Sequence, residues 1–164
     1  MTPTTLSIPN SPAILAVLLD TGPLGLAANP KASEEGKACN LWIEGLLVQG
    51  IEVFVPEITD YELRRELLQA RLLKSLAALD ELISSLDYLA LTTPVMRRAA
   101  ALWAEVRQAG QPTADCHALD GDVILAAQAL ALGYAPGEVV IATTNVGHLS
   151  RFLPARRWQD IPLL

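Results

Sequence analysis

Apolar residues along the chain form short unbroken runs that alternate with longer segments of three- and four-residue spacing. The runs at 14–19, 51–55, 87–91 and 138–143 predict four strands, and that at 51–55 is rich in β-branched and aromatic residues. A further strand is expected at the edge of the sheet, over 158–163. The first run is apolar throughout, which is typical of a strand buried on both faces in a parallel sheet.

The segments between these runs carry apolar residues at helical spacing. Ser33 is a good N-cap for a helix that ends at Gly50, and Pro56 suits the start of a helix that runs toward Leu72. The pairs Gly22-Pro23 and Asn29-Pro30 predict turns. Further helices are expected over 76–86, 95–110 and 117–132.

Strands that alternate with helices favour right-handed crossovers and a parallel sheet covered on both faces. We therefore expect one three-layer α/β/α domain, with a central, mainly parallel sheet of four or five strands. The domain is expected to span 13–164. Residues 1–12 contain three prolines and predict a flexible N-terminal tail.

Composition narrows the class of protein. The 164 residues are 51% apolar, enough for one sizeable core, and some apolar surface is expected to be covered by a partner or a second copy. The net charge of −6 argues against a protein that coats nucleic acid by bulk electrostatics, although local arginines still suit phosphate contacts. Cys39 and Cys116 lack metal-ligand spacing and predict no disulfide framework. A cytoplasmic protein with no membrane segment is expected.

Four acidic or amide side chains stand where strands give way to helices, or on helices. Asp20 follows the first apolar run and Asn145 follows the fourth, while Glu62 and Asp122 lie on predicted helices. Because ligands of open α/β sheets bind beyond the carboxyl ends of the strands, all four side chains are expected to face one crevice.

Clustered carboxylates repel one another and favour a bound cation. Mg²⁺, or Mn²⁺ with similar preferences, needs only two or three protein oxygens because it keeps several waters. Asp20, Glu62 and Asp122 are the primary candidate ligands, and Asp120 is an additional one. Such a metal activates water and neutralises charge on a transferring phosphoryl group, which predicts a metal-dependent nuclease.

Four segments in order resemble the PIN-domain signature, most closely that of VapC-type ribonuclease toxins. They are Leu18 to Leu24, Tyr61 to Arg65, Asp122 to Ala129 and Ala142 to Asn145, and the resemblance extends over about 14–153. It implies a PIN-like fold and a Mg²⁺- or Mn²⁺-dependent endoribonuclease that cleaves RNA by activated water. It also implies a homodimer and silencing by a small antitoxin.

The resemblance assigns roles to individual residues. Asp20, Glu62 and Asp122 match the acidic metal-binding positions, and Asn145 matches the fourth position of the site. Thr21 and Thr143 match hydroxyl residues that support these ligands. The chain departs from the pattern at Gly22, where many relatives have asparagine, and at His148-Leu149, which replace a frequent Asp-Phe pair.

Each candidate also has a structural interpretation. Asp20 suits a turn, Asn145 suits a helix cap, and Asp120 and Asp122 suit the first turns of a helix. The helix of Glu62 is expected to present a solvated ion-pair face, in which Asp60 pairs with Arg64. Arg64 and Arg65 near the crevice are candidates for binding RNA phosphates. Both histidines, His117 and His148, are expected at the surface.

The sequence also allows two functions other than a nuclease. Asp20 after a first strand loosely fits a phosphatase with a covalent aspartate, although no second aspartate follows two residues later. A non-catalytic PIN-fold module that only binds a partner is the other alternative, favoured by Asn145 and the acidic net charge. The tryptophans Trp42, Trp103 and Trp158 are expected to pack in the core or an interface rather than stack on bases.

Overall fold

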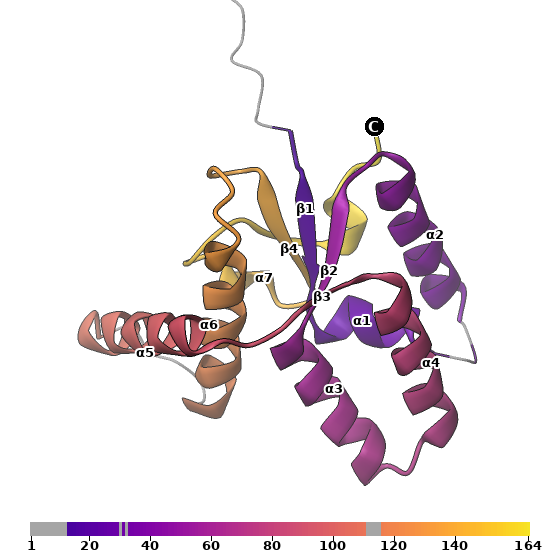
Figure 1. The fold of residues 1–164 in the computed structure, drawn as a ribbon, viewed down its shortest axis with the longest axis horizontal. Coiled ribbons are helices and arrows are strands. Elements are labelled where there is room, and N and C mark those ends of the chain that lie inside the picture. The colour runs from indigo at the N-terminus through magenta and orange to yellow at the C-terminus, as the bar shows by residue number, and fades with distance from the viewer. Residues whose placement is uncertain (1–12, 30, 32, 111–115) are drawn as a thin grey trace, which may run out of the picture.

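The computed structural model describes residues 13–29, 31, 33–110 and 116–164. The tail expected over 1–12 lies outside these residues. The described chain forms a central sheet with helices on both sides (Figure 1). Across this described part, the helices fall short of the length and apolar character that a bilayer crossing requires.

The sheet has five strands that all run parallel, in the order β3-β2-β1-β4-β5. The strands are β1 (Ala16–Leu19), β2 (Glu52–Pro56), β3 (Asp87–Leu89), β4 (Val139–Thr143) and β5 (Ala155–Arg157). The three-layer prediction is confirmed. The fifth strand, however, precedes the predicted 158–163 segment, where Trp158–Asp160 form a 3-10 turn instead.

The helices follow the predicted pattern with one addition. They are α1 (Thr21–Ala27), α2 (Glu34–Val48), α3 (Glu57–Gln69), α4 (Leu73–Ser85), α5 (Thr93–Gln108), α6 (Cys116–Ala131) and α7 (Val146–Leu149). As predicted, Ser33 caps α2, because its hydroxyl accepts a 3.0 Å hydrogen bond from the Gly36 N–H. The turn predicted at 22–23 is instead the first turn of α1, where a proline loses no helical hydrogen bond.

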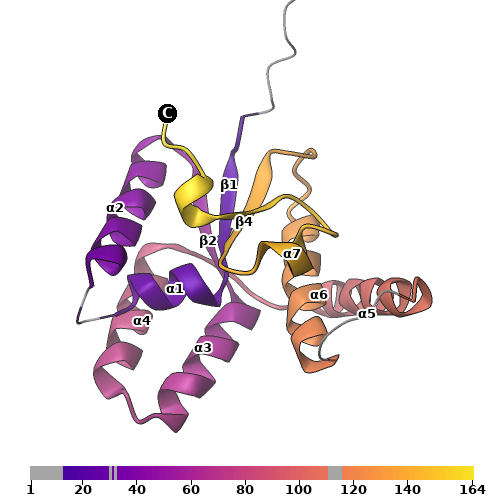
Figure 2. The same cartoon turned by 180° about the vertical axis from the view of Figure 1, so that it is seen from behind.

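Two apolar cores lie on the two faces of the sheet. Alternate strand residues such as Leu18 and Ile141 pack against α5, α6 and α7. Their neighbours, such as Leu19 and Ala142, pack against α1, α2 and α4. Figures 1 and 2 show α5 and α6 on one side of the strands, with α1 and α2 on the other.

The strand order places β1 at the point where the chain reverses direction across the sheet. The chain moves outward from β1 through β2 to β3, and then returns to add β4 on the other side of β1. Leu19 at the end of β1 pairs with Ala142, which precedes the last residue of β4. Such a switch point leaves a crevice beyond the carboxyl ends of the two strands, where α/β proteins bind ligands.

A buried glutamine connects the two helices that border this crevice. Gln128 on α6 is fully buried, and its side-chain oxygen accepts a hydrogen bond of 3.4 Å from the Ile58 N–H on α3. Its amide nitrogen donates one of 2.6 Å to the Leu89 carbonyl. Because buried polar groups are costly without partners, these bonds hold α6 against the start of α3.

Candidate metal centre

A cavity of about 740 Å³ opens at the carboxyl ends of β1 and β4. It is lined by six of the residues that the sequence singled out: Asp20, Thr21, Glu62, Asp120, Asp122 and Asn145. Asp20 directly follows β1, and Asn145 is the second residue after β4; the others lie on α1, α3 and α6. The fold therefore brings the separated acidic and amide side chains to one hollow.

Asp20 is held in place by hydrogen bonds to both of its carboxylate oxygens. Its Oδ1 accepts a bond of 2.8 Å from the Thr21 N–H, and its Oδ2 accepts one of 2.7 Å from the Thr143 hydroxyl. The Thr143 Oγ1 in turn accepts a bond of 2.9 Å from the Asn145 N–H. Asp20 thus caps α1 and at the same time faces the cavity.

Glu62 approaches α6 closely because a glycine faces it. A Cβ atom added to Gly121 would collide with Oε1 of Glu62, so only glycine leaves the carboxylate in its present position. A glycine inside an otherwise helical pattern is the one signal of this contact in the sequence, but the partner of that glycine depends on how α3 packs against α6.

The electrostatics of the cavity oppose the ionisation of two of its carboxylates. Burial, together with the negative charges of Asp20 and Asp122, raises the pKa of Glu62 from 4.5 to about 6, while Arg65 opposes the shift. Burial and Asp20 likewise raise the pKa of Asp122, and His148 and Arg151 oppose that shift. The excess negative charge is the condition under which a cation binds favourably.

His148 lies in the cavity wall rather than at an unrelated surface position. Its Nδ1 is 3.4 Å from Oδ2 of Asp122, and both side chains line the same hollow. The His148 side chain is 38% exposed, which agrees with the surface location expected for it, and it also borders the cavity. The other histidine, His117, has a side chain outside the described residues.

Asn145 occupies the N-cap position of α7 but does not cap it through its side chain. The prediction that the Asn145 side chain caps a helix is therefore wrong, since a capping side-chain oxygen would accept a backbone N–H of α7. The residue lines the cavity beside His148, and its backbone N–H is bonded to Thr143. Asn145 is therefore the fourth candidate polar residue that borders the cavity.

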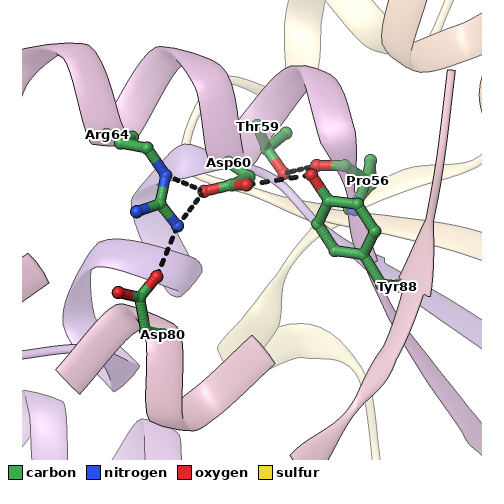
Figure 3. Close-up of polar contacts among 6 residues, drawn as sticks. All are labelled: Pro56, Thr59, Asp60, Arg64, Asp80 and Tyr88. Carbon is green, nitrogen blue, oxygen red and sulfur yellow. Dashed lines mark hydrogen bonds and ion pairs between the residues drawn. The ribbon is translucent and has the colours of Figure 1, made fainter. Parts of the chain in front are cut away.

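The two arginines of α3 differ in their surroundings. Arg65 lines the cavity. Arg64 instead binds Asp60 at 3.0 Å and Asp80 at 2.7 Å, and Tyr88 donates a hydrogen bond of 2.9 Å to the second oxygen of Asp60 (Figure 3). The expected pair between Asp60 and Arg64 is present, and it ties α3 to α4 and β3. Arg65 is thus the arginine of this pair that borders the hollow.

The donor set suits a hard divalent cation. Carboxylate and amide oxygens from Asp20, Glu62, Asp122 and Asn145 are the ligands that Mg²⁺ and Mn²⁺ prefer. Within the described residues, no three His, Cys, Asp or Glu side chains are close enough together to form a ready-made metal-binding group. The oxygens are therefore spread around a hollow, an arrangement that fits a cation which keeps several of its waters.

Comparison with known proteins supports the fold. No protein-family model matches the chain, and no curated protein is similar to it in sequence. The structure of VapBC2 from Rickettsia felis bound to a DNA fragment from their promoter contains a similar chain. The two chains are 19% identical, with a TM-score of 0.65, and the match covers 87% of this chain and 98% of that one.

Two further structures show the same likeness over 88% of this chain and 99% of the matched chain. One is VapBC-1 from nontypeable Haemophilus influenzae, at 18% identity and a TM-score of 0.62. The other is DNA-bound VapBC from Salmonella typhimurium, at 21% identity and a TM-score of 0.60. At these identities the likeness shows the fold, and it confirms the predicted PIN-like arrangement.

Proposed function

We propose that this chain is a divalent-metal-dependent endoribonuclease of the VapC type, the toxin of a type II toxin–antitoxin pair. The observation that carries the proposal is the convergence of Asp20, Glu62, Asp122 and Asn145 on one cavity at the switch point of the sheet. The shared fold with chains of VapBC structures supports it.

In this proposal the carboxylates of Asp20, Glu62 and Asp122 hold the cation, with the Asn145 amide beside them and Asp120 at the rim. Mg²⁺ or Mn²⁺ supplies an activated water and neutralises charge on the phosphoryl group under attack. Thr143 fixes the Asp20 carboxylate by its hydrogen bond of 2.7 Å, and Thr21 supports it through its backbone N–H. Because these hydrogen bonds already fix the Asp20 side chain, that side chain would lose little conformational entropy when a cation binds.

RNA would enter along the wall formed by α3. Arg65 lines the cavity, and its guanidinium lies 5.3 Å from the centre of the Tyr61 ring, which is 56% exposed. Arginine suits bidentate contact with phosphate, and an exposed aromatic ring suits stacking on a base. These side chains provide local attraction for a polyanion on a chain whose net charge is −6.

The partners follow from the same proposal. A small antitoxin protein would silence the nuclease, a homodimer would be the functional form, and the cytoplasm would be its location. The antitoxin is tested by co-expressing the chain with the small protein encoded beside it. Co-purification and loss of RNA cleavage are expected, and a freely active nuclease in the presence of that protein would contradict the toxin role.

Cleavage of single-stranded RNA by the purified chain tests the nuclease. We expect cleavage with Mg²⁺ or Mn²⁺ and none with a chelator. Asp20→Asn should abolish cleavage while its circular dichroism spectrum stays unchanged, because Asn has the same shape and its single side-chain oxygen can still accept one of the two hydrogen bonds. Glu81→Gln, at an exposed carboxylate on α4, is the matched control and should cleave normally. Full activity of Asp20→Asn would overturn the proposal.

A further inference from the structure

A second, smaller hollow of about 390 Å³ lies between α5 and α6, directly beside the acidic cavity. Met96, Ala100 and Trp103 of α5 form one wall, and Val123 of α6 contributes to the other. Asp120 and Ile124 line both this groove and the acidic cavity. A chain-like ligand bound in the cavity can therefore continue into the groove without leaving the surface.

Trp103 distinguishes this groove from the rest of the surface. The side chain is 36% exposed, whereas Trp42 and Trp158 are each 6% exposed and pack against one another with ring centres 5.7 Å apart. The helical pattern of α5 predicts that Trp103 is packed away, but the structure leaves it open. An exposed tryptophan in a groove is an unusual feature for a site without a ligand.

The indole of Trp103 lies beside a cationic side chain. The guanidinium of Arg107, one helical turn after Trp103, lies 5.4 Å from the centre of the indole. The same arrangement of an aromatic residue and an arginine four positions later occurs on α3, where Arg65 lies over Tyr61. Aromatic rings that stack on bases, with basic side chains that attract the backbone, are the features of single-strand binding sites.

We propose that the groove between α5 and α6 is a nucleobase subsite, in which one base of the RNA strand stacks on Trp103 while a phosphate of that strand lies in the acidic cavity. The inference rests on the proposed nuclease function for the identity of the strand. Arg107 would contact the backbone beside the stacked base. The volume of the groove suits a single base and its sugar rather than a folded partner.

The other candidate occupant is a second copy of the chain. A stable interface buries about 800 Å² per partner. On α5 the large apolar side chains left exposed are Met96 and Trp103, and they form a small patch around the groove. The size of the patch and its continuity with the acidic cavity both favour a base.

Tryptophan fluorescence of the intact chain tests the subsite directly, because the two buried tryptophans provide a constant background. The probe is a random-sequence hexaribonucleotide, with Ca²⁺ in place of Mg²⁺ so that an oxygen-liganded cation is present during binding. We expect quenching by the hexamer and little quenching by an abasic hexamer of equal length. Trp103→Phe should lose this response, since it removes the exposed indole.

Cleavage kinetics with Mg²⁺ provide the second measurement. Trp103→Ala should lower kcat/KM by about tenfold or more through KM, and Trp103→Phe should restore most of the loss because it keeps a ring for stacking. Leu41→Ala is the matched control, since Leu41 is 66% exposed on α2 and lines neither the cavity nor the groove, and it should cleave normally.

The outcomes separate this inference from the proposed function. If the wild-type chain cleaves RNA but shows no quenching, and Trp103→Ala cleaves normally, the subsite is overturned and the nuclease stands. If quenching occurs without cleavage, the base site stands and the nuclease fails. If RNA leaves the fluorescence unchanged and Trp103→Ala turns a dimer into a monomer in light scattering, the groove is an interface between copies and the inference is overturned.

Discussion

The hydroxyl of Thr143 donates a hydrogen bond of 2.7 Å to the carboxylate of Asp20, although 123 residues separate the two in sequence. The bond crosses the switch point of the sheet, from the last residue of β4 to the residue after β1. Thr143 is fully buried, and its oxygen also accepts the Asn145 N–H. One hydroxyl thus orients two of the four groups that define the candidate metal centre.

Replacing Thr143 by valine tests this role, because valine has the same shape without the hydroxyl. We expect Thr143→Val to lose about 1–3 kcal/mol of unfolding free energy, since it removes one partner each from the Asp20 carboxylate and the Asn145 N–H. RNA cleavage should fall as well. Thr143→Ser keeps the hydroxyl and should retain most of both properties. Denaturant unfolding and cleavage assays check these outcomes; a fully stable and active valine variant would contradict them.

The raised pKa of Glu62 predicts that this residue lowers the unfolding free energy of the metal-free protein, by an amount that depends on pH. Below about pH 4.5 the carboxyl is protonated in both the folded and the unfolded chain, so it does not change the unfolding free energy. As the pH rises from 4.5 to about 6, the unfolded chain releases the proton first and stability falls. Without metal, Glu62→Gln should therefore melt at a higher temperature than wild type at pH 7–8 and at a similar temperature near pH 4.

With added Mn²⁺ at pH 7–8, the wild type should melt at a higher temperature than Glu62→Gln, because the cation binds the ionised carboxylate and stabilises only the folded chain. The wild-type melting temperature should rise, and that of Glu62→Gln should rise much less. Glu66→Gln, an exposed carboxylate one turn later on α3, controls for loss of charge and should respond as wild type does. Equal metal responses in wild type and Glu62→Gln would exclude Glu62 as a ligand.

The sequence predicts the centre of the sheet well because β1 and β4 are apolar runs that are buried throughout. Two local elements were missed. The Gly22-Pro23 pair predicts a turn, whereas Pro23 occupies the first turn of α1, where a proline is tolerated. The edge strand is predicted at 158–163, but Trp158 and Ile161 belong to the buried cluster under α1 and α2. Ala155–Arg157 pair with β4 instead.

Asp20 and Asn145 can be predicted from the sequence because they follow strands, and ligands bind beyond the carboxyl ends of the strands. Glu62 and Asp122 lie near the starts of helices that border the same crevice. Residues that depend on the approach of two helices cannot be predicted in this way. Gly121 matters only because Glu62 faces it, and Gln128 matters only because Ile58 and Leu89 need partners. The exposure of Trp103 depends in the same way on how α5 crosses α6, which periodicity along one helix does not specify.

The two arginines of α3 provide a matched pair for separating stability from RNA binding. Arg64 is bonded to the exposed Asp80 and to the buried Asp60, so Arg64→Ala should lower the unfolding free energy by about 1–3 kcal/mol, chiefly because the Asp60 carboxylate loses its cationic partner. Arg65 lines the cavity, so Arg65→Ala should raise KM for RNA and reduce its salt dependence. Thermal melts and cleavage at two salt concentrations check both. A larger KM effect from Arg64→Ala would reverse the assignment.

Gly121→Ala tests whether the position of Glu62, rather than its mere presence, makes the metal centre. The added methyl group would occupy the space of the Glu62 carboxylate, and the flexible end of that side chain has to move. The substitution should not destabilise α6, because alanine is a better helix former than glycine by roughly 0.5–1 kcal/mol. We therefore expect an unchanged circular dichroism spectrum but Mn²⁺ binding weakened about tenfold or more in calorimetry.

Gly147→Ala is the matched control for this change. It also places a methyl group on a helix beside the cavity, on α7, but there a Cβ would meet nothing within 4 Å. Its metal affinity and RNA cleavage should equal those of the wild type. If Gly121→Ala binds Mn²⁺ as tightly as Gly147→Ala does, the Glu62 carboxylate tolerates displacement and its present contact with α6 does not define the site. If both variants lose binding, the effect comes from disturbed helices and not from the approach of Glu62 to Gly121.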